Sequence, residues 1–139
     1  DRFKMCQLAT SPFPWAEVSD YDLCSPPPSY SWRTAEHFKS LFPNAQLFWL
    51  MGSDQWRSIA RWERAHHFAS LLKIIVYSRK SEASFVQSFE STLLNTLQHP
   101  ASATAIRGQL VEGKNSPWLH PAVASHIKKN CLYLKSPLD

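Results

Sequence analysis

Two short apolar runs are the clearest hydrophobic pattern along the chain. Leu47–Met51 is an unbroken apolar segment, and Ile74–Tyr77 is a second one that is rich in β-branched side chains. Continuous apolar runs of this length are typical of parallel strands that are covered on both faces. Both segments are therefore predicted to be strands of one parallel sheet.

Apolar residues with helical spacing occur before, between and after these strands. The predicted boundaries include Ser31 as an N-cap, Gly113 as a stop and Pro121 in a first turn. The predicted helices cover residues 2–9, 31–42, 62–72, 85–89, 104–111 and a last segment from Pro121 onward. Alternating residues predict a short strand at Trp15–Ser19, whereas Thr92–Leu97 fits a helix or a strand. The predicted fold class is α/β, a parallel sheet with flanking helices.

Length and composition narrow the class of protein. The 139 residues are 44% hydrophobic and 19% charged, which favours one globular domain over residues 1–139. The apolar runs are too short to cross a bilayer, and Lys73 interrupts the best of them. Cys6, Cys24 and Cys131 lack metal-ligand or redox spacing, which favours the cytoplasm. The mild net charge of +4 suits anionic small molecules as readily as nucleic acid.

The segment Ser102–Arg107 is a candidate phosphate site. It places two hydroxyls, Ser102 and Thr104, at a predicted helix start, and Arg107 follows one turn later. Unpaired amides at a helix N-terminus attract phosphate, and a guanidinium matches the geometry of phosphate oxygens. The alternative is that one hydroxyl caps the helix and Arg107 is solvated. From this hexapeptide alone, the capping alternative is favoured.

Polar residues also follow both predicted strands. Gly52 and Asp54 come directly after the first strand, and Arg79 follows the second. Ligands of open α/β sheets bind beyond the carboxyl ends of the strands, and a carboxylate there suits a ribose. Alternatively, Asp54 caps the next helix and Arg79 is simply exposed. Two strand ends and one helix start with polar groups together indicate a nucleotide.

Several other kinds of site are not supported by the sequence. His66 and His67 are adjacent, so they face different sides of a helix, and no further ligand stands at zinc spacing. Neither a Walker loop, a G-x-G-x-x-G motif nor a serine nucleophile elbow occurs. Trp62 has helical spacing, for which core packing is the ordinary explanation.

Taken in order, these segments resemble one family nearly from end to end, the bacterial nicotinate-mononucleotide adenylyltransferases. This family belongs to the nucleotidyltransferase superfamily, which has a Rossmann-like fold. Ser102–Arg107 is similar to the family's Ile-Ser-Ser-Thr-x-Ile-Arg signature, although Ala103 replaces the second serine and Ala101 the isoleucine. The other similar segments are Arg2–Ala9, Pro28–Thr34, Leu47–Asp54, Trp62, Val76–Arg79 and Pro121–Tyr133.

The resemblance implies transfer of AMP from ATP to nicotinate mononucleotide, with magnesium carrying pyrophosphate charge. It implies that the residues that bind ATP are Gly52, Asp54, Ser102, Thr104 and Arg107. It implies that Tyr30, Ser31, Trp62 and the backbone near Glu63 bind the pyridine nucleotide. It also implies that Arg79 lies near the nucleotide phosphates. Ser78 and Lys80-Ser81 depart from the family pattern around Arg79. Small-molecule nucleotides are the expected partners, with no nucleic acid, membrane or metal site; the oligomeric state is left open.

The family's first strand and its catalytic His-x-Gly-His motif have no counterpart in the 139 residues. We therefore expect an N-terminally truncated chain that has no catalytic residue of its own and little activity alone. Because the first strand would lie beside Leu47–Met51, we also expect that Phe48 and Leu50 form an unpaired strand edge or borrow a neighbour there. Two alternatives stay open: a related adenylyltransferase for nicotinamide mononucleotide or phosphopantetheine, and a non-catalytic nucleotide-binding module.

Overall fold

The computed structural model describes residues 1–77, 88–94 and 100–133. Its contacts divide the chain into two compact units. One unit combines Asp1–Asp20 with Pro100–Asp139, and the other is the continuous segment Tyr21–His99.

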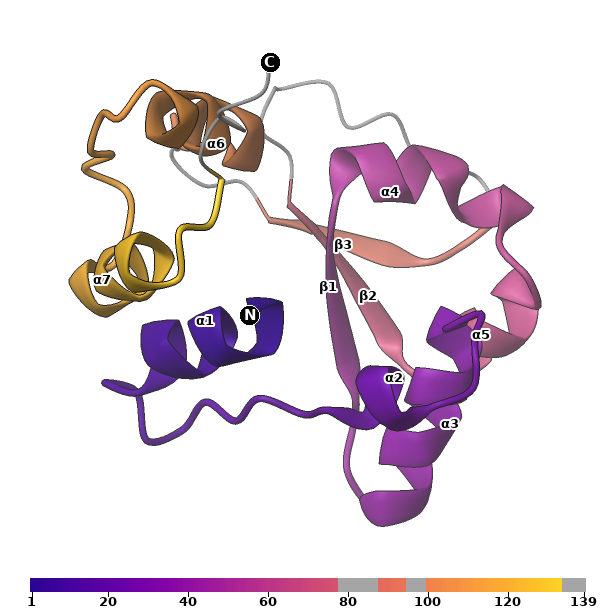
Figure 1. Cartoon of the computed structure of the whole chain (residues 1–139). Coiled ribbons are helices and arrows are strands. Elements are labelled where there is room, and N and C mark those ends of the chain that lie inside the picture. The colour runs from indigo at the N-terminus through magenta and orange to yellow at the C-terminus, as the bar shows by residue number, and fades with distance from the viewer. Residues whose placement is uncertain (78–87, 95–99, 134–139) are drawn as a thin grey trace. The chain divides into compact units, whose positions relative to one another are not determined.

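The unit Tyr21–His99 contains a parallel sheet of three described strands in the order β1-β2-β3 (Figure 1). The strands are β1 (Phe48–Gly52), β2 (Lys73–Tyr77) and β3 (Ser91–Leu94). In the register, Met51 pairs with Val76, and Val76 pairs with Leu93. The two predicted strands are thus confirmed, and the ambiguous segment at Thr92 begins as a strand.

Helices cover one face of this sheet, and alternation along the strands decides which face. The helices are α2 (Tyr21–Cys24), α3 (Ser31–Leu41), α4 (Ser53–Ser58), the 3-10 helix η1 (Ile59–Arg61) and α5 (Ala65–Leu71). Met51, Ile74 and Val76 point to the same face, because residues two apart on a strand and register partners share a side. They form a buried core with Ala35, Trp56, Ile59, Phe68 and Leu72.

The other face of β1 is open. Phe48 and Leu50 are 59% and 64% exposed, although both are large apolar residues. Among the described strands, β1 pairs with β2 alone, so its second edge has no strand partner. The expected unpaired edge at Phe48 and Leu50 is confirmed among the described strands.

The second unit contains α1 (Arg2–Thr10), α6 (Ala103–Val111) and α7 (Pro121–Lys129). Within it, α1 packs against α7, and Asp1 Oδ1 lies 3.0 Å from His126 Nε2. Val123 and Ile127 form the buried stripe of α7. α7 ends at Lys129, and Cys131 beyond it is exposed.

Three local predictions are wrong. Trp15–Ser19 is not a strand, because an alternation of apolar and polar residues does not by itself provide a strand to pair with. Trp15 is 82% exposed, and its ring lies beside that of Phe13. Ser31 is the first residue of α3 rather than its N-cap, which is Tyr30. Trp62 does not open a helix, because its backbone is extended between η1 and α5. The predicted helix at 85–89 falls largely outside the described residues.

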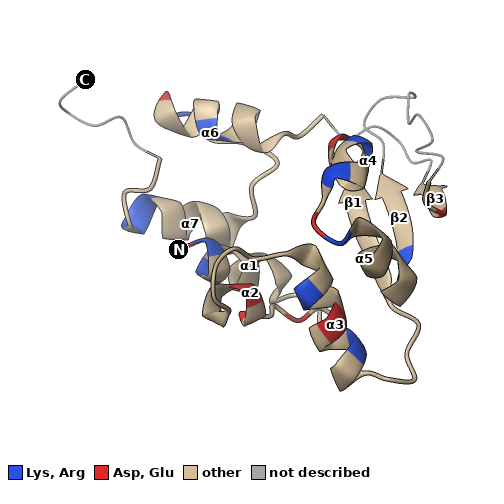
Figure 2. Ribbon diagram, turned by 90° about the vertical axis from the view of Figure 1, so that its right-hand side faces the viewer, with Lys and Arg blue, Asp and Glu red and all other residues tan. Residues whose placement is uncertain are grey.

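Charge is sparse on the sheet. Lys73 is the one charged residue in the three described strands. Figure 2 shows Lys, Arg, Asp and Glu mainly on helices and on the connections between elements. Within the described part of the chain, no helix has the length and apolar character needed to cross a membrane.

Candidate functional site

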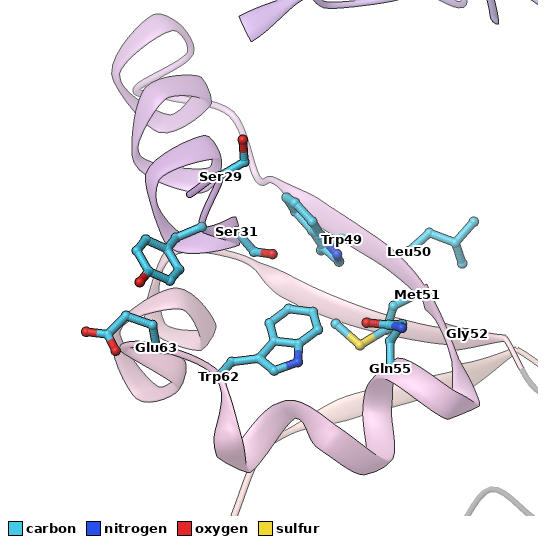
Figure 3. Close-up of a pocket in the computed structure, with 10 residues that line it drawn as sticks. Ser29, Ser31, Trp49, Leu50, Met51, Gly52, Gln55, Trp62 and Glu63 are labelled. Carbon is cyan, nitrogen blue, oxygen red and sulfur yellow. The ribbon is translucent and has the colours of Figure 1, made fainter. Parts of the chain in front are cut away.

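A cavity of about 630 Å³ lies at the carboxyl end of β1 in the unit Tyr21–His99 (Figure 3). Its volume suits a small organic ligand, and its place beyond a strand end is where α/β sheets bind ligands. The lining residues are Ser29, Tyr30, Ser31, Trp49, Leu50, Met51, Gly52, Gln55, Trp62 and Glu63. The structure thus brings together all four residues assigned to the pyridine nucleotide.

The N-terminus of α3 forms one wall of this cavity. Tyr30 is the N-cap, and no side chain caps the helix there. The Tyr30 carbonyl accepts from the N–H groups of Arg33 and Thr34, at 2.9 and 3.4 Å. The first amides of a helix have no partner within it and carry partial positive charge. This wall therefore favours an anionic group such as a carboxylate.

Two hydrogen bonds to Asp22 fix the entry into α3. The buried Thr34 hydroxyl donates to Asp22 Oδ1 at 2.6 Å, and the Ser29 hydroxyl donates to the Asp22 carbonyl at 3.2 Å. Because Asp22 lies on α2, these bonds tie α2 to the segment that carries Tyr30 and Ser31. Thr34 therefore supports the wall from behind and does not line the cavity.

Trp62 forms the opposite wall. It is half-buried: its ring lies 5.6 Å from that of Phe68, and its Nε1 donates to Ser58 Oγ at 3.2 Å. In Figure 3 the indole projects into the cavity towards Trp49, while the Glu63 side chain turns away. One part of the ring packs on the core and the other borders the cavity, so an aromatic ligand can stack there.

Sequence reasoning missed Ser29, Trp49, Leu50, Met51 and Gln55 as lining residues. Trp49 and Met51 had only a strand-core signal, because residues that line a cavity from a strand have the same hydrophobic pattern as core residues. Gln55 offered a usable signal: it is a polar residue directly after Gly52-Ser53-Asp54, one turn into the helix after β1.

Gly52 and Asp54 are packed closely at the end of β1. A Cβ added to Gly52 would lie 2.5 Å from Asp54 Oδ1. The backbone of Gly52, at φ −76°, suits any residue, so a larger side chain here would displace only the flexible carboxylate end of Asp54. Gly52, and not Asp54, is the N-cap of α4, and Asp54 is exposed in the first turn. The alternative that Asp54 is the helix cap is therefore wrong.

Ser102, Thr104 and Arg107 belong to the other compact unit. Ser102 is the N-cap of α6, and its Oγ accepts from the Ala105 N–H at 3.1 Å. Thr104 and Arg107 are exposed and three residues apart, so they share a face of α6. Capping thus accounts for Ser102, whereas Thr104 and Arg107 remain available to solvent or a ligand. Arg79 lies outside the described residues.

Comparisons with known proteins agree on one family, although no family model matches the chain. A probable nicotinate-nucleotide adenylyltransferase of Methylacidiphilum infernorum is 36% identical over 137 residues, covering 96% of this chain and 66% of the relative. Probable nicotinate-nucleotide adenylyltransferases of Neisseria gonorrhoeae and Staphylococcus epidermidis are each 30% identical, covering 97% and 95% of this chain. The chain spans 74% and 69% of those two relatives.

A solved structure shows the same fold. The nicotinic acid mononucleotide adenylyltransferase of Plasmodium falciparum, complexed with APC, superposes with a TM-score of 0.59 at 19% identity. The match covers 76% of this chain and 58% of that one. The parallel sheet with flanking helices is accordingly of the Rossmann-like nucleotidyltransferase type. On the evidence of its sequence relatives, the chain belongs to the nicotinate-nucleotide adenylyltransferase family.

Proposed function

We propose that the protein transfers AMP from ATP to nicotinate mononucleotide, forming deamido-NAD and pyrophosphate. Beside membership of the family, the observation that supports this function is the cavity at the end of β1. It combines an aromatic ring that a pyridine can stack on, Trp62, with the helix N-terminus of α3, which has no side-chain cap. A pyridine ring with a carboxylate needs both features.

In this proposal the pyridine nucleotide occupies the cavity. The ring stacks on Trp62, and the carboxylate accepts hydrogen bonds from backbone amides near Ser31 and Glu63. Tyr30 and the Ser31 hydroxyl shape the polar end of the cavity. The Glu63 side chain turns away, as Figure 3 shows, so the backbone of Glu63 is the part proposed to bind.

We assign ATP to the residues that the resemblance to the family implies. Asp54 accepts hydrogen bonds from the adenosine ribose, and Gly52 leaves room for the carboxylate to fold over it. Thr104 and Arg107 bind phosphate oxygens from the exposed face of α6. The N-terminus of α6, which Ser102 caps, also attracts the phosphates. Arg79 is proposed to lie near the phosphates.

The reaction proposed is an in-line attack of the mononucleotide phosphate on the α-phosphorus of ATP. A phosphate oxygen forms the new bond to phosphorus while the bond to pyrophosphate breaks, with no covalent enzyme intermediate. The residues of this chain bind and orient the two nucleotides, and none is proposed to be catalytic. Among the described residues, no three His, Cys, Asp or Glu side chains form a cluster for a metal ion. Magnesium is proposed to arrive bound to the ATP phosphates, where it would carry part of the charge of the pyrophosphate.

Residues 1–139 are proposed to belong to one nucleotidyltransferase domain of a cytoplasmic enzyme. The three cysteines are exposed and unbonded, which supports a reducing compartment. Small-molecule nucleotides are its proposed partners.

The experiment is a pyrophosphate-release assay of the full-length protein with ATP and one acceptor at a time. We expect turnover with nicotinate mononucleotide to exceed that with nicotinamide mononucleotide or phosphopantetheine. Preference for either of the other acceptors would assign a related adenylyltransferase activity. Binding of nucleotides without pyrophosphate release would indicate a non-catalytic module.

A further inference from the structure

Two arginines flank one tryptophan beside the cavity. Trp32 lies in the first turn of α3, and the guanidinium carbon of Arg64 lies 4.5 Å from its ring centroid. The guanidinium carbon of Arg33 lies 5.3 Å from the same ring. Both distances are within the range of cation–π attraction, for which tryptophan offers the strongest ring. None of these three residues lines the cavity.

The two arginines differ in what they connect. Arg33 is on α3, next to Trp32, so its contact stays within one helix. Arg64 follows Trp62 and Glu63 directly and is the N-cap of α5. Its contact with Trp32 therefore joins the segment that carries Trp62, on one wall of the cavity, to the segment that carries Tyr30 and Ser31, on the other wall.

The backbone at Arg64 is unusual. It has φ +52° and ψ +39°, a left-handed conformation that residues other than glycine rarely adopt. This corner turns the chain from the extended Trp62 into α5, and the Arg64 carbonyl accepts from the Phe68 N–H at 2.9 Å. A glycine would meet the backbone requirement better than arginine does. Any advantage of arginine over glycine at this corner must therefore come from its side chain.

We propose that Arg64 is a positioning residue for the pyridine nucleotide. Its guanidinium, held on the face of Trp32, sets the separation of the two cavity walls and so the place of the Trp62 ring opposite the N-terminus of α3. A second link between the helices, His67 Nε2 to Glu36 Oε1 at 2.6 Å, joins α5 to α3 farther along the chain from Trp62. Of these two links, the one made by Arg64 is nearer to Trp62 in sequence. This inference rests on the proposed function.

The test is Arg64→Gly in the full-length protein, with KM measured separately for nicotinate mononucleotide and ATP. Glycine removes the guanidinium but keeps the left-handed corner without strain, so the melting temperature should stay the same or rise. We expect KM for the mononucleotide to rise about three- to tenfold, which is the size of a partly exposed cation–π contact. KM for ATP should change less than twofold.

Arg33→Ala is the matched control. It removes the same charge from the same ring, together with a contact to the Tyr30 ring at 5.4 Å, but breaks no link between the walls, so KM for the mononucleotide should rise less than in Arg64→Gly. An equal rise in both variants would mean that positive charge, and not positioning, is responsible. That result would overturn the proposal.

A double-mutant cycle with Trp32→Phe separates the contact from a general loosening of the corner. Phenylalanine preserves packing but offers a weaker ring face, so Arg64→Gly should raise KM by a smaller factor in that background. The same factor in both backgrounds would overturn the proposal. Absence of turnover by the unaltered protein would overturn the proposed function and this inference together. Normal turnover with unchanged KM in Arg64→Gly would overturn this inference alone.

Discussion

Replacing Trp62 by alanine separates stacking from packing at the cavity wall. The ring is half-buried, in contact with Phe68 at 5.6 Å and hydrogen-bonded to Ser58 at 3.2 Å. If the rest of the ring holds the pyridine, Trp62→Ala must weaken substrate binding as well as stability. Trp56, six residues earlier and 0% exposed, is the matched control for packing alone.

The two expected magnitudes differ between these tryptophans. A base–aromatic stack is worth about 1 to 3 kcal/mol, so KM for nicotinate mononucleotide should rise about 5- to 150-fold in Trp62→Ala. Truncating a fully buried tryptophan costs about 3 to 5 kcal/mol of unfolding free energy, as expected for Trp56→Ala. Because Trp62 is only half-buried, its loss should cost about 2 kcal/mol.

The assay combines denaturant unfolding with steady-state kinetics on each purified full-length variant. Trp62→Phe should retain most of the mononucleotide affinity, because a phenyl ring still stacks. Trp56→Phe supplies a folded control if Trp56→Ala does not fold, and it should leave KM unchanged. A Trp62→Ala variant that loses stability like Trp56→Ala but keeps its KM would refute the stacking role.

Further predictions concern ATP. In Gly52→Ala, the new Cβ would lie 2.5 Å from Asp54 Oδ1 and displace this carboxylate, so KM for ATP should rise severalfold, as in Asp54→Asn. If KM for ATP stayed normal in both variants, Asp54 would have no part in ribose binding. Arg107→Ala removes an exposed charge-assisted contact worth about 1.5 to 3 kcal/mol, so kcat/KM for ATP should fall by about one to two decades with stability unchanged. Ser102→Ala should instead cost about 1 kcal/mol of stability through the lost cap, measured by denaturant unfolding; no such loss would contradict the capping geometry.

The sheet could be predicted from sequence because its signal is local. The apolar run Leu47–Met51 has the length and composition of a strand, and both predicted strands appear in register, although Phe48 and Leu50 are exposed instead of covered. The start of β3 was ambiguous because four residues are too few to display a period. Trp15–Ser19 failed for the opposite reason: its alternation is clear, but strand formation also requires a pairing partner that sequence does not reveal.

The candidate site was predictable where residue identity and strand position agree. Gly52 had a position at a strand end, and Tyr30 and Ser31 came from the family resemblance. Trp49 was unpredictable, because the same side chain on the same strand could equally have been core. The contact between Arg64 and Trp32 was also beyond sequence reasoning, since it requires a left-handed corner at a residue that rarely adopts one.

The most direct test of the account is a crystal structure of the full-length protein with nicotinate mononucleotide bound. The account predicts the pyridine ring stacked on Trp62 inside the cavity at the end of β1, with its carboxylate at the N-terminus of α3. A nucleotide bound elsewhere, with Trp62 packed against Phe68 and no ligand on its ring, would contradict it.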